Sequence, residues 1–141
     1  MPERSFTLRA RLRGMREARG DYLAFVDADD RFHSATVLED ILRTAMATGA
    51  DITHFYTVTQ DEYGVELLRK PALPFADRLE GRRIFTGWVQ EKCSAHSVWC
   101  KMYSRALYEK VRAMPHEHCL YYHEDFYLTV HFLFWAELYV R

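Results

Sequence analysis

The sequence predicts an α/β fold in which short strands alternate with amphipathic helices. Apolar residues recur at helical spacing from about Phe6 to Arg19 and again from about Ala35 to Thr48. Between these stretches, Tyr22–Val26 is a short apolar run, as expected of a buried strand, and three carboxylates follow it. Because nearly half of the residues are apolar and no linker divides the chain, we expect a single domain over residues 1–141.

The composition argues against several classes of function. A formal net charge of -1 gives no reason to expect a nucleic-acid partner. The three cysteines, Cys93, Cys100 and Cys119, form no Cys-x-x-Cys pair, so reduced thiols in a cytosolic protein are the simplest interpretation. No apolar run approaches the ~18–20 residues of a membrane span, and none resembles a secretory signal. We therefore expect a cytoplasmic protein without a transmembrane segment, either free or peripheral at the inner membrane face.

The first expected helix, from about Phe6 to Arg19, places Leu8, Leu12 and Met15 on one face and ends before Gly20. Its other faces are rich in arginine, which most simply indicates a solvated basic surface. The arginines of the first 19 residues are Arg4, Arg9, Arg11, Arg13, Arg16 and Arg19.

Three carboxylates stand at the end of the apolar run Tyr22–Val26. Burying unpaired carboxylates is too costly, so Asp27, Asp29 and Asp30 are expected at the mouth of the strand, where open α/β sheets bind ligands. Clustered carboxylate oxygens suit a hard divalent cation, which in turn suits a diphosphate. The sequence therefore predicts a metal-assisted diphosphate site at this position.

The rest of the chain continues the alternation of strands and helices. Ser34 is the expected N-cap of the second helix, and Gly49 is expected to end it. The later elements are expected as a strand over Asp51–Thr59, a turn at Glu62–Gly64, a returning strand over Val65–Leu68, a helix around Leu79–Lys92, a strand within Val98–Arg105, a helix over Ala106–Arg112 and a largely buried helix over Phe126–Ala136.

The stretch Ala10–Asp30 resembles the centre of a family 2 glycosyltransferase, a GT-A-fold enzyme that uses nucleotide-diphosphate sugars. The family's Arg-Asn-x-Gly helix corresponds to Arg11–Gly14, although Leu12 replaces the asparagine. Its Ala-x-Gly-x-Tyr turn corresponds to Ala18–Tyr22, and its Asp-x-Asp-Asp loop is present as Asp27–Asp30. The resemblance is specific because a helix, a turn, a strand and an acidic loop follow in the family's order.

Two later stretches also resemble this family. Trp99 and Lys101 belong to a run similar to the family's Trp-x-Lys-Leu-Tyr strand, on the acceptor side of the site, although core packing is an equal explanation for the tryptophan. Glu124 and Asp125 resemble the Glu-Asp pair that opens a helix after the acceptor loop, and His123, because it is next to them, is expected on the acceptor side. Carboxylates in a first helical turn also stabilise the helix, so a capping role for the pair remains an alternative.

The resemblance implies glycosyl transfer from a nucleotide-diphosphate sugar, most often UDP-linked, to a hydroxyl of a carbohydrate or lipid-linked acceptor, as in polysaccharide biosynthesis. It implies that Arg11, Asp27, Asp29 and Asp30 bind the nucleotide, and that Asp29 and Asp27 hold Mn²⁺ or Mg²⁺. It also implies that Asp125, assisted by Glu124, takes the acceptor proton, and a single base of this kind inverts the anomeric centre.

The resemblance covers only the later part of the family's domain, because 26 residues precede Asp27. The expected fold is therefore a GT-A-like, Rossmann-like mixed sheet flanked by helices and truncated at its N-terminal side. Such a truncation leaves a sheet edge unpaired, which favours pairing with a second copy in a homodimer.

Three alternatives stay open at the level of sequence. A strand ending in Asp-x-Asp also begins haloacid-dehalogenase-like phosphatases, but Arg31 stands where that family has Thr or Val and no late Gly-Asp-x-x-x-Asp motif follows. A catalytically inactive remnant that binds nucleotide or metal, or acts only as an interaction module, is the second. The third is a zinc site, whose spacing fits no common pattern, formed from His116, Glu117, His118, Cys119 and His123.

Overall fold

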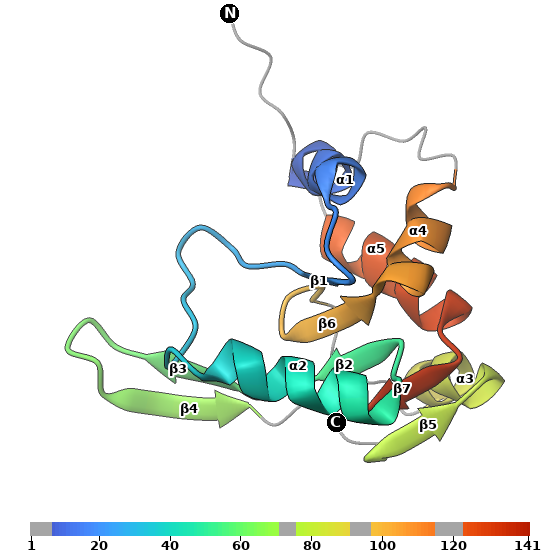
Figure 1. Ribbon diagram of the computed structural model, residues 1–141. Helices are drawn as coiled ribbons and strands as arrows, with labels where there is room; N and C mark the ends of the chain where they lie inside the picture. The colour runs from blue at the N-terminus through green and yellow to red at the C-terminus, as the bar shows by residue number, and fades with distance from the viewer. Residues whose placement is uncertain (1–6, 71–75, 91–96, 115–122) are drawn as a thin grey trace, which may run out of the picture.

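The computed structural model describes residues 7–70, 76–90, 97–114 and 123–141 as a mixed α/β domain (Figure 1). The helices are α1 (Thr7–Glu17), α2 (Val37–Thr48), α3 (Arg82–Gln90), α4 (Arg105–Arg112) and α5 (Glu124–Trp135). The strands are β1 (Tyr22–Ala24), β2 (Ile52–His54), β3 (Thr57–Gln60), β4 (Glu66–Lys70), β5 (Arg78–Glu80), β6 (Lys101–Ser104) and β7 (Leu138–Val140). The expected mixed sheet flanked by helices is confirmed.

The main sheet has the strand order β1-β6-β2-β7-β5. Strand β6 pairs antiparallel with both β1 and β2, β2 pairs parallel with β7, and β7 pairs antiparallel with β5. Among the described strands, β1 therefore lies at one edge of the sheet, as expected, and pairs only with β6. A dimer formed through this edge remains a prediction.

Strand β1 is less buried than its apolar sequence suggests. Its three residues are only half-buried, and Val26, just beyond it, has 48% of its surface exposed. The expectation of a buried strand was wrong because an edge strand has a neighbour on one side only, which leaves part of each side chain uncovered.

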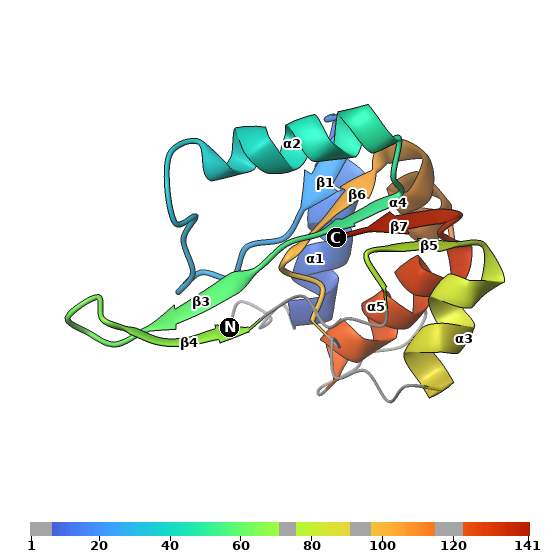
Figure 2. The ribbon, with the colours of Figure 1, turned by 90° about the horizontal axis from the view of Figure 1, so that it is seen from below.

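Helix α2 covers one face of the sheet, and the other four helices lie against the opposite face (Figure 2). Side chains alternate between these layers along β6. Met102 packs with Ile41 and Ala45 of α2, whereas its neighbour Tyr103 joins the larger core beneath α1, α4 and α5. Tyr103 is fully buried and stacks on Phe132 of α5, with 3.9 Å between the ring centroids.

Helix α1 forms because its apolar residues align on one side. Leu8, Leu12 and Met15 are all buried, as expected from their spacing. Helix α2 begins later than predicted, because Thr36 and not Ser34 precedes it. The Ser34 hydroxyl lies 3.3 Å from that of Thr36 and caps no helical N–H. Gly49 ends α2 in a left-handed conformation (φ 67°), as the sequence predicts.

The expected strand Asp51–Thr59 is interrupted after β2. The chain leaves the main sheet at Phe55 and Tyr56, and β3 pairs with β4 in a separate two-stranded sheet that projects from the domain (Figures 1 and 2). The Asp61 carboxylate accepts the backbone N–H of Tyr63 and of Val65, which fixes the connecting turn. The expected hairpin is confirmed, but the single long strand is not.

Strands β5 and β7 were not expected from the sequence. Each has three residues, too few for an alternating pattern to stand out from the neighbouring helices. Asp51 joins this region to β6: its carboxylate accepts the Ser104 hydroxyl at 2.8 Å and the backbone N–H groups of Glu137 and Leu138 at 2.8 and 3.3 Å. None of the helices in the described ranges is long and apolar enough to cross a bilayer.

Candidate functional site

Arg11 is the centre of an ion-pair network that links three segments of the chain. Its side chain, which is only 9% exposed, extends from α1 between the acidic loop and the start of α5. One guanidinium nitrogen, Nη2, donates to Asp27 Oδ1 at 2.8 Å. The other, Nη1, contacts Asp125 Oδ1 and lies 3.7 Å from Glu124 Oε1. One cation thus holds carboxylates that are about a hundred residues apart in sequence.

The acidic loop follows β1 in a tight turn. The backbone N–H of Asp30 donates to the carbonyl oxygen of Asp27 at 3.0 Å, while Asp29 is exposed at the turn. Burial, together with the negative charges of Asp29 and Asp27, raises the pKa of the Asp30 carboxyl. The three carboxylates therefore repel one another, as expected where a cation is to bind.

The charge of this region is negative overall. Asp27, Glu124 and Asp125 lie around the guanidinium of Arg11, and Asp29 and Asp30 follow Asp27 on the same loop. A nucleoside diphosphate is itself an anion, so its approach here is opposed unless a cation intervenes.

The acidic loop offers too few ligands to hold a metal ion by itself. In the part of the chain that the structure describes, no three His, Cys, Asp or Glu side chains converge as a metal site. Mg²⁺ in proteins, however, commonly takes one or two carboxylates and completes its octahedron with water and substrate phosphates. Asp29, which is exposed, and Asp27 fit this role in company with a diphosphate.

Helix α5 presents its acidic first turn to Arg11. Glu124 and Asp125 are half-buried, and His123, the residue before the helix, is exposed in a left-handed conformation (φ 61°). The His123 side chain makes no capping bond, so a helical cap does not explain its presence.

Two of the predicted acceptor-side residues, Trp99 and Lys101, are not among the ion-pair partners that the structure gives Arg11. The third, His123, directly precedes Glu124. Trp99 is half-buried just before β6, and Lys101 is the first residue of that strand. The ammonium group of Lys101 is buried and donates to the carbonyl oxygen of Ser97 at 2.6 Å. Burial lowers its pKa, an effect that the neighbouring Cys100 partly offsets. Lys101 has the partner that a charged residue within a strand requires.

A buried polar group near β6 was not expected from the sequence. His54 Nδ1 lies 2.5 Å from the hydroxyl of Tyr139, and its Nε2 lies 3.3 Å from the sulfur of Cys100, which is a free thiol. Burial, and then the charges of Lys101 and Arg141, lower the pKa of His54 to about 2. The imidazole is therefore neutral at physiological pH. Only the tertiary structure brings these residues together, because they come from three different strand ends.

The structure brings Arg11, Asp27, Glu124 and Asp125 into contact, with Asp29 and Asp30 on the same loop as Asp27. Their roles, and those of Trp99, Lys101 and His123, stay predictions. The residues proposed as a zinc site lie outside the described residues, except His123.

The comparison with known families identifies one family. The profile described as Glycosyl transferase family 2 matches residues 1–112. This chain belongs to glycosyltransferase family 2. A comparison with curated proteins gives no match.

Membership of the family supports a glycosyl-transfer function for this domain. The family generally uses a nucleotide-sugar donor, a carbohydrate acceptor and a divalent metal ion. The match includes α1, the acidic loop and β6 and ends within the range of α4, so Glu124 and Asp125 lie beyond it.

Proposed function

We propose that this chain transfers a sugar from a UDP-sugar to a hydroxyl group of a carbohydrate or lipid-linked acceptor, with a divalent cation and with inversion at the anomeric carbon. The observation that carries the proposal is the Arg11 network, in which one guanidinium joins the acidic loop to the start of α5. It brings a candidate donor site and a candidate base within the reach of one side chain.

The donor's diphosphate belongs at the acidic loop. Asp29 and Asp27 would hold Mn²⁺ or Mg²⁺ together with diphosphate oxygens, and Asp30 would line the nucleotide side. The bound ion would act as a Lewis acid that neutralises the diphosphate leaving group. The excess of carboxylates over cations in this region supports a requirement for that ion, because the protein alone repels the donor.

Asp125 would act as the base. Its carboxylate would accept the proton of the acceptor hydroxyl while the hydroxyl oxygen forms a bond to the anomeric carbon. The bond from that carbon to the diphosphate oxygen breaks at the same time, and the nucleoside diphosphate leaves with the electron pair. One displacement from the opposite side inverts the anomeric centre. Glu124 would keep the region anionic, and His123 and Trp99 would border the acceptor, whereas Lys101 is buried and would act only from within the domain.

Arg11 holds two of these carboxylates in the protein without ligand. A phosphate oxygen that approached its guanidinium would compete with Asp27 and Asp125, so a phosphate-binding role requires one of these pairs to open. We also propose that the reaction takes place in the cytoplasm or at the inner membrane face, where the donor and a lipid-linked acceptor would meet.

Calorimetric titration of UDP tests the donor site. We expect binding with Mn²⁺ but not with EDTA, and loss of binding in Asp29→Ala. Asp40→Ala is the matched control, because Asp40 is an exposed aspartate in the first turn of α2, on another part of the molecule. Equal binding by wild type and Asp29→Ala would contradict the assignment of the donor to this loop.

Release of UDP from a panel of UDP-sugars tests catalysis separately. We expect Asp125→Asn to keep metal-dependent UDP binding and to lose turnover. Binding without turnover by the wild type across a broad panel of acceptors would instead support a remnant that binds nucleotide and performs no chemistry.

A further inference from the structure

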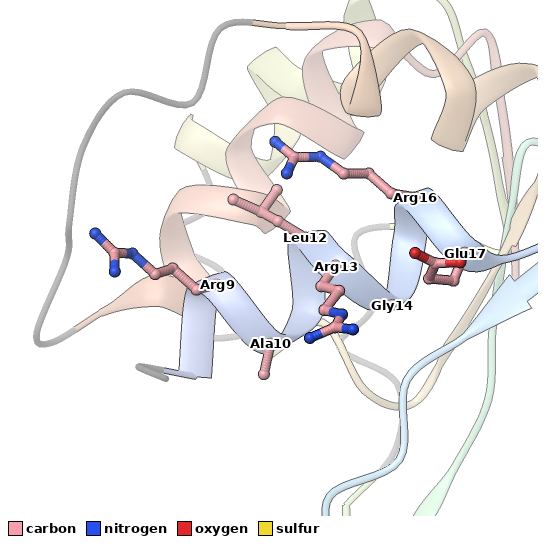
Figure 3. A pocket seen from close by; sticks show the side chains of 7 residues that line it. All are labelled: Arg9, Ala10, Leu12, Arg13, Gly14, Arg16 and Glu17. Carbon is pink, nitrogen blue, oxygen red and sulfur yellow. The ribbon is translucent and has the colours of Figure 1, made fainter. Parts of the chain in front are cut away.

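The exposed side of α1 carries a hollow that the proposed reaction does not use. Figure 3 shows its described lining, which comes entirely from this helix. The lining residues are Arg9, Ala10, Leu12, Arg13, Gly14, Arg16 and Glu17. Three of the seven are arginines, in a protein whose formal net charge is -1.

The three arginines lie on one side of the helix. At 100° per residue, Arg9, Arg13 and Arg16 fall within about 60° of one another. Arg11 points elsewhere, toward the acidic loop and α5. The hollow and the Arg11 network are therefore on different sides of α1.

These arginines have no anionic partner within the described ranges. Arg11, Arg43 and Arg105 each pair with carboxylates, whereas the structure gives no ion pair to Arg9, Arg13 or Arg16. The helix macrodipole favours Arg16, which lies in the last turn of α1, but it disfavours Arg9, which lies in the first turn. Three guanidinium groups thus remain available to an external anion.

Gly14 also belongs to this lining, at least about 100° around the helix from each of the three arginines. A Cβ atom built on Gly14 meets nothing within 4 Å, and its backbone is not left-handed, so neither packing nor conformation requires glycine there. Glycine within a helix is less favourable than alanine. Its effect here is to leave one side of the hollow without a side chain.

We propose that this hollow binds a phosphate-bearing ligand. Guanidinium groups form paired, charge-assisted hydrogen bonds to phosphate oxygens, and three of them border one open space. Among the described lining residues, Glu17 is the one acid, and it opposes binding. The ligand's phosphate can belong to a soluble anion or to a lipid headgroup, and the same arginines serve either source.

Titration of sodium pyrophosphate into the full chain in EDTA tests the site in solution. Without a divalent cation the acidic loop repels pyrophosphate, so binding at the proposed donor site does not interfere. We expect the variant Arg9→Gln/Arg13→Gln/Arg16→Gln to bind at least about tenfold more weakly than wild type. We expect Glu17→Gln to bind more tightly, because it removes the opposing charge.

The matched control is Arg43→Gln/Arg82→Gln/Arg83→Gln, which removes the same three charges from exposed positions on other helices. Sedimentation with vesicles tests the lipid source, using phosphatidylcholine alone and with added phosphatidylglycerol. Membrane affinity should fall by about fivefold for each arginine removed from the hollow. Circular dichroism verifies that every variant is folded.

The two sources give different results. Pyrophosphate binding that depends on the three arginines supports a soluble phosphate ligand, and vesicle binding alone that depends on them supports a lipid headgroup. Absence of both, or equal losses in the hollow and control variants, would overturn the proposal and leave a solvated basic face. UDP binding with Mn²⁺ is a separate measurement, so failure here does not affect the proposed transfer reaction.

Discussion

Replacing Arg11 with methionine tests the ion-pair network most directly. Methionine keeps a long apolar side chain but removes the cation that pairs with both Asp27 and Asp125. Breaking a buried ion pair costs about 3–5 kcal/mol, because a charge is left without compensation. Here the carboxylate side chains are 23–37% exposed and regain some water, so we expect a loss of about 2–3 kcal/mol.

Urea unfolding followed by circular dichroism measures this loss. For a chain of 141 residues, the unfolding entropy predicts about 3–4 °C per kcal/mol, so the melting temperature should fall by about 6–10 °C. In a double-mutant cycle with Asp27→Asn, we expect a coupling energy of about 1–2 kcal/mol. This coupling separates the ion pair from the packing of the arginine stem.

Arg43→Met is the matched control for this prediction. Arg43 also contacts two carboxylates, Glu39 and Asp40, but its side chain is 67% exposed. Exposed ion pairs contribute little to stability, so Arg43→Met should lower the unfolding free energy by less than about 0.5 kcal/mol. Equal losses in the two variants, or additive effects of Arg11→Met and Asp27→Asn, would refute the reasoning that burial strengthens this network.

Three further predictions concern stability. The pKa of His54 is depressed to about 2 in the folded protein, so below pH 6.5 only the unfolded state gains a proton at this imidazole. As the pH falls, the contribution of His54 to the unfolding free energy should therefore decrease by up to about 1.4 kcal/mol per pH unit, and above pH 7 it should stay constant. Urea unfolding from pH 7 to pH 4 should show a weaker pH dependence of the unfolding free energy in His54→Gln than in wild type. Parallel profiles for the two proteins would contradict this prediction. Asp51→Ala should cost about 2–4 kcal/mol in urea unfolding, because it leaves three donors without an acceptor; a loss below about 1 kcal/mol would mean that water replaces the carboxylate. Gly14→Ala should increase the unfolding free energy by up to about 1 kcal/mol, and so raise the melting temperature, because the added methyl group meets no atom within 4 Å. A lower melting temperature would contradict this prediction.

The sequence by itself determined the α/β class, the helices and the position of the acidic loop. Helices α1 and α2 are long enough for apolar residues to recur on one face, and Gly49 marks the end of α2. The acidic loop was predictable because three carboxylates follow an apolar run directly and unpaired carboxylates are too costly to bury. These signals are local: each depends on residues within one or two helical turns.

The tertiary structure alone decided how these parts meet. Strands β5 and β7 depend on pairing between distant segments, and three residues carry too little pattern to reveal it. Arg11 reaches Asp125 only because α1 packs against α5, and no local spacing encodes that contact. His54, Cys100 and Tyr139 likewise meet across neighbouring strands. Residue types and short periodicities fix the elements, whereas long-range packing decides which charges share a site, because two residues distant in sequence interact only after the chain has folded.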